Sequence, residues 1–139
     1  QAEGAWLTAR EILRTVREKG IRADAIGGLT LGADPIVCPV AAISHAEGPK
    51  LRAFIVRKEA KEHGTGRRIE GNLVPKSRVI IVDDVVTTAG STIKAIEAAE
   101  AEGHTVVAVI CLVDREEGGA AKLAAYPFYS LFKRSEIFE

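Results

Sequence analysis

Residues 79–93 read Val79-Ile80-Ile81-Val82-Asp83-Asp84-Val85-Val86-Thr87-Thr88-Ala89-Gly90-Ser91-Thr92-Ile93. The four β-branched apolar residues at the start predict a strand that is buried on both faces, as in parallel sheets. The two adjacent carboxylates are expected to end this strand, where burial is costly unless the acids have partners. Ser91 and Thr92 can then cap a helix that begins near Ile93. Together these features predict a phosphate cradle beside hydroxyl-binding carboxylates, which suits a phosphorylated sugar.

Two other interpretations share part of this pattern. A loop that caps a helix after a core strand would produce it without any ligand. A receiver domain also ends a strand with two acids, but there the acids close the first strand. In this chain Asp83 and Asp84 come past the middle. The residues outside this stretch distinguish among the three.

Length and charge set the first limits. The 139 residues predict one domain, residues 1–139, that is large enough to bury a core. Nineteen basic and nineteen acidic side chains cancel, so no overall positive field indicates a nucleic-acid partner. No apolar run reaches transmembrane length and no signal-peptide pattern opens the sequence, which predicts a cytoplasmic protein with no membrane partner.

Several isolated residues are expected to be structural. Cys38 and Cys111 both lie in apolar runs, so we expect them to be small core residues rather than a disulfide or a metal pair. His45 and His104 are placed at helix ends, and we expect both on the surface. Trp6 is expected to pack against its helix rather than to stack on a ligand.

Helical and strand patterns alternate along the chain. The apolar residues between 5 and 16 share one helical face, and Gly20 is expected to end that helix. Further helices are predicted over residues 35–45, 93–103 and 120–125, and further strands over 24–28, 51–56, 105–113 and 128–132. After 51–56 the chain is expected to return as a hairpin through residues 69–74. This alternation predicts a mostly parallel α/β sheet with right-handed crossovers.

Four polar segments follow predicted strands, namely Leu29–Asp34, a basic loop at residues 57–66, Asp83–Thr92 and Asp114–Gly119. Ligands of such sheets bind beyond the carboxyl ends of the strands, where the strand order reverses. The sequence therefore predicts one site to which all four segments contribute.

The basic loop reads Arg57-Lys58-Glu59-Ala60-Lys61-Glu62-His63-Gly64-Thr65-Gly66. Its cations can neutralise a departing diphosphate, and its glycines allow the loop to close. Taken alone, a charged loop of this kind is more often a solvated surface segment.

The other two segments are ambiguous on their own. Gly27–Pro35 has neither the Rossmann glycine spacing nor a P-loop lysine, so it could be an ordinary turn between a strand and a helix. Arg115 carries a guanidinium fork that suits a carboxylate or a pyrimidine oxygen, but an ion pair that caps a short helix explains it equally well.

In combination, these segments resemble the orotate phosphoribosyltransferases of the type I phosphoribosyltransferase family. Residues 79–92 resemble the family's 5-phosphoribosyl 1-diphosphate (PRPP) signature, and Arg-Lys-Glu-x-Lys-x-His-Gly at 57–64 resembles its flexible catalytic loop. Gly27–Pro35 resembles the diphosphate-binding loop, and the segment Asp114–Gly119 resembles the Asp-Arg-x-Glu-x-Gly motif. The resemblance covers the chain from about Asp24 to its end. It implies a three-layer α/β/α fold with a mostly parallel central sheet and a hairpin that carries the flexible loop.

The resemblance also implies an activity, which is transfer of the phosphoribosyl group from PRPP to orotate, giving orotidine 5′-monophosphate and diphosphate. It implies a homodimer with shared active sites and Mg²⁺ bound through substrate and water near Asp83 and Asp84, without direct protein ligands. The implied catalytic residues are Lys61, His63, Asp83 and Asp84. The implied PRPP-binding residues are Arg57, Lys58, Lys61, His63, Asp83, Asp84, Val85, Val86, Thr87, Thr88, Ala89, Gly90, Ser91 and Thr92. Thr30, Leu31 and Gly32 would face the diphosphate, and Thr87 and Arg115 would hold orotate.

This sequence departs from the family pattern in two places. Orotate phosphoribosyltransferases usually begin with a further helix and a small hood that contacts the base, and no such segment precedes Gln1. We therefore expect the catalytic core without that front segment. Some relatives also carry a lysine where Gly32 stands. A PRPP-binding regulator, an inactive scaffold of the same fold and a transferase for another nucleobase remain alternatives.

Overall fold

The computed structural model describes residues 2–59 and 67–137 of the chain. Its centre is a six-stranded sheet in the order β3-β2-β1-β4-β5-β6. The strands are β1 (Ala25–Leu29), β2 (Arg52–Val56), β3 (Ile69–Glu70), β4 (Arg78–Val86), β5 (Thr105–Asp114) and β6 (Phe128–Lys133). All neighbouring strands are parallel except β2 and β3, which are antiparallel. The predicted mostly parallel sheet with one hairpin is confirmed.

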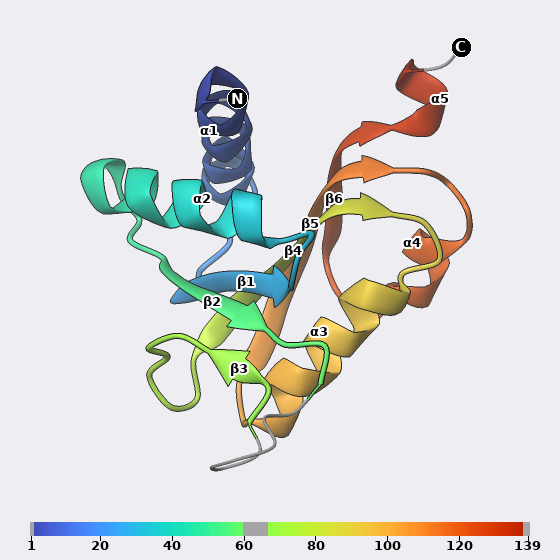
Figure 1. Ribbon diagram of the computed structural model, residues 1–139. Coiled ribbons are helices and arrows are strands. Elements are labelled where there is room, and N and C mark those ends of the chain that lie inside the picture. Colours follow the sequence, from blue (N-terminus) through green and yellow to red (C-terminus); the bar gives the residue numbers. More distant parts are fainter. Residues whose placement is uncertain (1, 60–66, 138–139) are drawn as a thin grey trace.

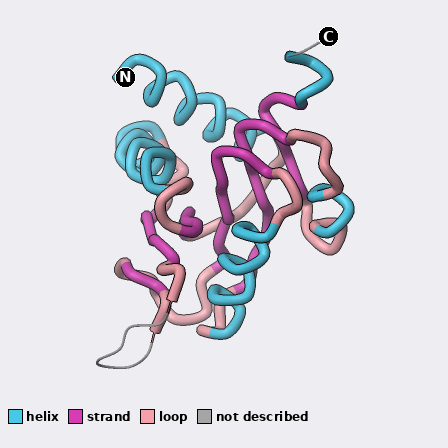
Figure 2. The backbone as a smooth tube through the Cα atoms, turned by 45° about the vertical axis from the view of Figure 1, so that its right-hand side comes forward, coloured by secondary structure: helices cyan, strands magenta, loops and turns pink. Residues whose placement is uncertain are grey.

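Helices cover both faces of the sheet. Helices α1 (Ala2–Glu18) and α2 (Asp34–Glu47) lie on one face, and α3 (Gly90–Ala101) lies on the other, as Figures 1 and 2 show. The short helices α4 (Gly119–Lys122) and α5 (Arg134–Ile137) flank β6 in the sequence. These elements form three layers, as the resemblance implied.

The continuous apolar run of β4 is explained by burial on both faces. Val79 and Ile81 belong to the core under α3, whereas Ile80 and Val82 belong to the core under α1 and α2. All four side chains are at most 1% exposed. Because side chains alternate along a strand, such a run suits a strand that is covered on both sides.

Helix α1 is amphipathic as predicted. Ile12, Leu13 and Val16 are at most 1% exposed and pack in the same core as Val37 and Val40 of α2. Charged residues of α1 face outward, where Arg14 is held between Glu11 and Glu18.

The strand order reverses between β1 and β4. The chain passes from β1 through α2 to β2 on one side of β1, and β4 then pairs with the other side of β1. The crevice between the carboxyl ends of β1 and β4 is therefore where ligands bind in open sheets of this type.

Several local predictions were wrong. Strand β4 does not end at the acids but continues to Val86, because Val85 and Val86 still pair with Val113 and Asp114 of β5. Helix α3 begins at Gly90, with Ala89 at its N-cap in the left-handed region (φ 71°) and without a side-chain cap. The return strand β3 has two residues rather than six, and α5 was not predicted.

Two expectations about single residues were also wrong. Cys38 is exposed on α2, whereas Cys111 is buried as predicted, and both are free cysteines. His104 is buried rather than on the surface, and its Nδ1 accepts a hydrogen bond from the Ser77 amide at 3.1 Å.

Trp6 is 49% exposed, with the Arg10 guanidinium 5.0 Å from the centre of its ring. No helix among the described residues is long and apolar enough to cross a bilayer.

Candidate active site

A cavity of about 240 Å³ opens at the carboxyl ends of β1 and β4. Residues of three predicted segments line it together, with Lys58 contributed by the start of the basic loop after β2. The other lining residues are Leu29, Thr30, Leu31, Gly32, Asp83, Asp84, Val85 and Ser91. The predicted convergence is confirmed for these segments.

The two carboxylates of the cavity differ in environment. Asp83 is 8% exposed, and its Oδ2 accepts a hydrogen bond from the Thr92 hydroxyl at 3.3 Å. Its Oδ1 accepts the Asp84 amide at 2.8 Å. Asp84 is exposed, and its Oδ1 accepts the Val85 amide at 2.7 Å. The buried Thr92 side chain therefore donates its hydrogen bond to Asp83 instead of capping α3.

Burial, together with the neighbouring Asp84 carboxyl, raises the pKa of Asp83 to about 7. Near neutral pH, both forms of the Asp83 side chain are therefore populated. The ionised carboxylate only accepts hydrogen bonds, and the protonated carboxyl group can also donate one. An acidic pair of this kind can bind vicinal hydroxyl groups in either protonation state.

Gly32 brings the β1–α2 turn close to the acids. A β-carbon at Gly32 would lie 2.9 Å from Asp83 Oδ1 and 3.0 Å from Asp84 Oδ1, so a larger side chain would require a shift. The turn is held by the Thr30 amide, which donates to the Val56 carbonyl at 2.9 Å. The Thr30 hydroxyl donates to Asp34 Oδ2 at 3.0 Å. This turn is therefore placed directly beside the carboxylates.

The segment between β4 and α3, where the sequence predicts a phosphate cradle, leads directly into the N-terminus of α3. Amides in the first turn of a helix have no backbone acceptor within the helix, and the helix dipole adds positive charge there. Ser91 lines the cavity at this end of α3. The side chains of Val86, Ala89 and Thr92, by contrast, are at most 3% exposed, so these residues shape the cradle from beneath.

Gly119 supports the cradle and was not among the predicted site residues. Its amide donates to the Thr87 carbonyl at 3.0 Å. A β-carbon there would lie 2.6 Å from Val86 Cγ1 and 2.7 Å from the Thr87 oxygen. The adjacent pair Gly118-Gly119 was the sequence signal for this close approach.

Arg115 does not line the cavity of the carboxylates. Its backbone amide donates to the Val86 carbonyl at 2.9 Å, which fixes the backbone next to the cradle. Its side chain is half exposed, and its Nε lies 3.2 Å from Glu117 Oε2. The ion pair of the alternative interpretation is thus present, but it does not cap α4, whose N-cap residue is Gly118 and which has no side-chain cap.

The basic loop is described only in part. Lys58 lines the cavity of its own chain, and Arg57 forms an ion pair with Glu70 across the hairpin. Lys61 and His63 lie outside the described residues.

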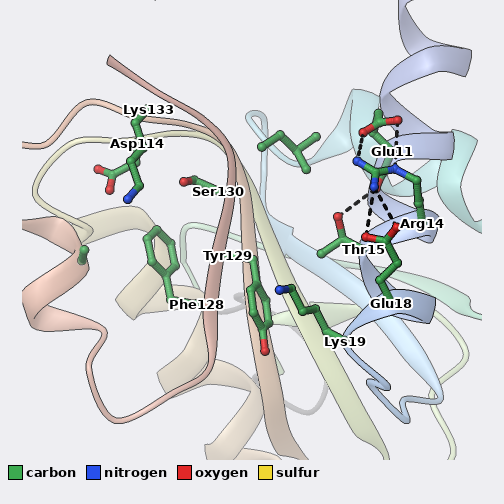
Figure 3. Close-up of a pocket in the computed structure, with 12 residues that line it drawn as sticks. Glu11, Arg14, Thr15, Glu18, Lys19, Asp114, Phe128, Tyr129, Ser130 and Lys133 are labelled. Carbon is green, nitrogen blue, oxygen red and sulfur yellow. Dashed lines mark hydrogen bonds and ion pairs between the residues drawn. The ribbon is translucent and has the colours of Figure 1, made fainter. Parts of the chain in front are cut away.

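A larger cavity of about 430 Å³ lies between α1 and β6 and was missed by sequence reasoning (Figure 3). Asp114, at the end of β5, lines it together with Tyr129 and Lys19. The Lys19 amine lies 5.6 Å from the centre of the Tyr129 ring. Arg14 in this cavity already pairs with Glu11 and Glu18. Neither member of the acidic pair is among its lining residues, so it is separate from the site described above.

A model of the phosphoribosyl transferase domain matches residues 8–138. Orotate phosphoribosyltransferase from Aquifex aeolicus (strain VF5) is 45% identical over 137 residues, which cover 97% of this chain and 74% of the relative. The enzyme of the same name from Rhodopirellula baltica is 40% identical over 126 residues, which cover 88% and 65%. The chain thus spans roughly two thirds to three quarters of these relatives' lengths.

Solved structures give the same result. Mycobacterium tuberculosis H37Rv orotate phosphoribosyltransferase in complex with PRPP superposes with a TM-score of 0.84 and 34% identity, over 99% of this chain and 77% of that chain. The same enzyme in complex with Fe(III) dicitrate gives a TM-score of 0.87 and 35% identity, over 100% and 78%. Adenine phosphoribosyltransferase from Thermoanaerobacter pseudethanolicus is 21% identical with a TM-score of 0.71, covers 96% of this chain and 82% of that chain, and shares the fold. Sequence and structure together show that the chain belongs to the phosphoribosyltransferase family and, within it, to the orotate phosphoribosyltransferases.

Proposed function

We propose that this chain carries the core of a PRPP-dependent transferase that attaches the phosphoribosyl group to orotate, giving orotidine 5′-monophosphate and diphosphate. The observation that carries the proposal is the buried acidic pair beside the N-terminus of α3, with the Gly32 turn and Lys58 in the same cavity. The M. tuberculosis relative of the same fold has been solved with PRPP.

Each part of PRPP has a matching group in this site. The 5-phosphate would bind the amides and hydroxyls of residues 87–92, where the dipole of α3 favours an anion. Asp83 and Asp84 would accept hydrogen bonds from the two ribose hydroxyls. The diphosphate would lie toward Thr30, Leu31 and Gly32. Lys58 is the basic side chain among the described residues that line this cavity.

The reaction separates charge, because the anomeric carbon becomes cationic as diphosphate leaves. Fixed hydrogen-bond donors and cations that face the leaving group stabilise the negative charge that develops on the diphosphate, and they do so without having to reorganise. Lys58 is available for this role, and we assign Lys61 and His63 to it as well, together with the exclusion of water. The orotate nitrogen that attacks the anomeric carbon loses its proton in this step, to water or to the departing diphosphate, and we assign no side chain as a general base.

The donor set fits Mg²⁺ held largely by substrate and water. The described residues contain no cluster of three or more His, Cys, Asp or Glu side chains that could enclose a metal. Mg²⁺ commonly keeps several waters and binds substrate phosphates, and Asp83 and Asp84 would hold its waters by hydrogen bonds rather than bind the ion directly. When bound, the ion would neutralise charge on the diphosphate.

We place orotate near Thr87 and Arg115. Glu117 now holds the Arg115 side chain, and a carboxylate ligand offers the same guanidinium a competing partner. Exchange of that partner would bring Arg115 toward the base without moving its backbone, which Val86 fixes.

The decisive experiment follows the absorbance of orotate after addition of PRPP and Mg²⁺, with an Asp84→Asn variant as the control. We expect orotate to be consumed by the wild-type chain and much more slowly by the variant. PRPP binding without turnover would favour the regulator or the inactive scaffold instead. Turnover with adenine, hypoxanthine or uracil but not with orotate would favour a transferase for another nucleobase.

A further inference from the structure

A hydrogen-bond cluster holds the base of the basic loop against the far end of α3. Glu102 follows the last residue of α3, and its Oε2 accepts the amides of Arg68 and Ile69 at 3.2 and 3.3 Å. Ile69 begins β3 and Arg68 immediately precedes it, so both amides lie on the arm by which the chain returns from the loop. One carboxylate thus joins the β2–β3 hairpin to the helix that begins at the phosphate cradle.

Arg68 continues this cluster to the other arm of the hairpin. Its guanidinium donates to the Arg57 carbonyl at 3.1 and 3.0 Å and to the Lys58 carbonyl at 2.9 Å. The Arg57 amide donates back to the Arg68 carbonyl at 2.7 Å. The backbone of Lys58 is therefore fixed by a side chain from the opposite arm.

These contacts determine where the Lys58 side chain can reach. Lys58 lines the cavity that holds Asp83 and Asp84. It follows β2, and the strand that pairs with β2 on this side, β3, does so at only two residue pairs. Two pairs at the edge of a sheet hold a hairpin weakly. The contacts from Glu102 and Arg68 add the connection that the short ladder lacks.

We propose that Glu102 and Arg68 are positioning residues that set Lys58 for PRPP binding. This inference rests on the proposed function, since Lys58 is taken to contact the diphosphate. Helix α3 then connects the two, with the predicted phosphate cradle at its N-terminus and the base of the loop held beside its C-terminus.

A purely structural role for Glu102 is the alternative, since a carboxylate that accepts two edge amides could simply stabilise the hairpin. The two roles differ in one measurable respect. A residue that acts through Lys58 loses its effect on PRPP binding once Lys58 is removed, whereas an independent residue keeps its effect.

The test measures PRPP affinity by calorimetry for Glu102→Ala, Glu102→Gln and Glu97→Ala, each alone and with Lys58→Ala. Glu102→Ala should weaken binding about threefold to tenfold, the equivalent of one hydrogen bond. Glu102→Gln keeps an acceptor oxygen and should stay within about twofold. Glu97, an exposed residue of the same helix, should have no effect. In the Lys58→Ala background, Glu102→Ala should add less than about twofold.

Two results would overturn the proposal. One is an effect of Glu102→Ala that is equally large without Lys58, and the other is unchanged PRPP affinity in Glu102→Ala. Amide hydrogen exchange tests the cluster without ligand, because Arg68 and Ile69 should exchange faster in Glu102→Ala than in Glu102→Gln. Unchanged exchange would disprove the cluster itself. Failure of the wild-type chain to bind PRPP, with faster exchange still observed in Glu102→Ala, would instead disprove the proposed function and the role in binding that rests on it.

Discussion

At the scale of single residues, the acidic pair is central to the site. Asp84 is its exposed member and lies in the cavity with Lys58. We expect Asp84→Asn to weaken PRPP binding by about 1.5–3 kcal/mol, because the substitution removes a charge-assisted hydrogen bond. Calorimetry with PRPP and Mg²⁺ measures this change, and Glu97→Gln, an exposed carboxylate on α3, is the control. Equal affinities for the two variants would show that Asp84 does not contact PRPP.

A separate prediction concerns the contribution of Asp83 to the pH dependence of stability. Its pKa rises from 3.8 to about 7 on folding, so between these values the folded state binds more protons than the unfolded state. The contribution of Asp83 to the free energy of unfolding therefore decreases as pH rises from about 4 to about 7. Asp83→Asn removes this titration. Urea unfolding at several pH values should show that the wild-type chain loses stability relative to Asp83→Asn across that interval. A constant difference would mean that the pKa of Asp83 is not raised.

Gly32 allows a clean steric test. Because a β-carbon would lie within 3.0 Å of both carboxylates, Gly32→Ala must displace the turn or the acids. Displacements of about 1 Å can reduce turnover up to about a hundredfold. We expect a marked loss of PRPP-dependent turnover with a small change in melting temperature. Gly4→Ala is the matched control, since the added carbon at Gly4 would meet no atom within 4 Å beyond its chain neighbours and the backbone of its own helix. A Gly32→Ala variant with normal turnover would contradict the close packing at this turn.

At the scale of elements, His104 connects two segments at the amino edge of the sheet. Its Nδ1 accepts the Ser77 amide, and the Thr105 amide donates to the Ser77 carbonyl at 2.9 Å. His104→Ala would leave a buried amide without a partner and should cost about 1–3 kcal/mol of unfolding free energy. Asn can place an acceptor oxygen near the position of Nδ1, so His104→Asn should restore part of the loss. His45→Ala, at an exposed position, should change the stability little. Equal stabilities for the two His104 variants would show that the hydrogen bond contributes nothing.

Sequence patterns predicted a helix or strand well where the buried faces of that element alone determine which of its residues are apolar. The run at residues 79–82 and the amphipathic face of α1 both follow directly from which faces are covered. The errors lie where a tertiary contact overrides a local preference. Thr92 resembled a helix cap, but Asp83 takes its hydroxyl. The acids resembled a strand end, but pairing with β5 extends β4 past them.

Site residues could be predicted from the sequence where they lie at or just after the carboxyl end of a strand. The turn at Thr30–Gly32 and the acidic pair meet because β1 and β4 are neighbours in the sheet. The role of Glu102 could not be read from the sequence, because it depends on backbone amides that are distant along the chain. The pair Gly118-Gly119 indicates a close backbone approach, but not that its partner is Thr87. His104 was misplaced for the same reason, since its partner Ser77 lies 27 residues earlier.

At the scale of the whole molecule, we propose a homodimer in which the basic loop completes the site of the neighbouring chain. Lys58 lines the cavity that holds the acids of its own chain, so the proposal concerns Lys61 and His63, as the resemblance to orotate phosphoribosyltransferases implies. Two inactive variants test it, namely Lys61→Ala, which impairs the loop, and Asp84→Asn, which impairs the pocket. In a mixed dimer, a loop that acts in trans would join the intact pocket of the first variant to the intact loop of the second.

We therefore expect mixing to restore about one working site per mixed dimer, or roughly a quarter of wild-type turnover if the subunits exchange at random. A loop that acts within its own chain would leave one lesion in every site, and mixing would then restore nothing. Native mass spectrometry of the mixture measures subunit exchange, and each variant mixed with itself is the control. Exchange without any gain in turnover would overturn the shared site. A chain that stays monomeric at the assay concentration but turns over orotate would do the same, because its own loop would then suffice.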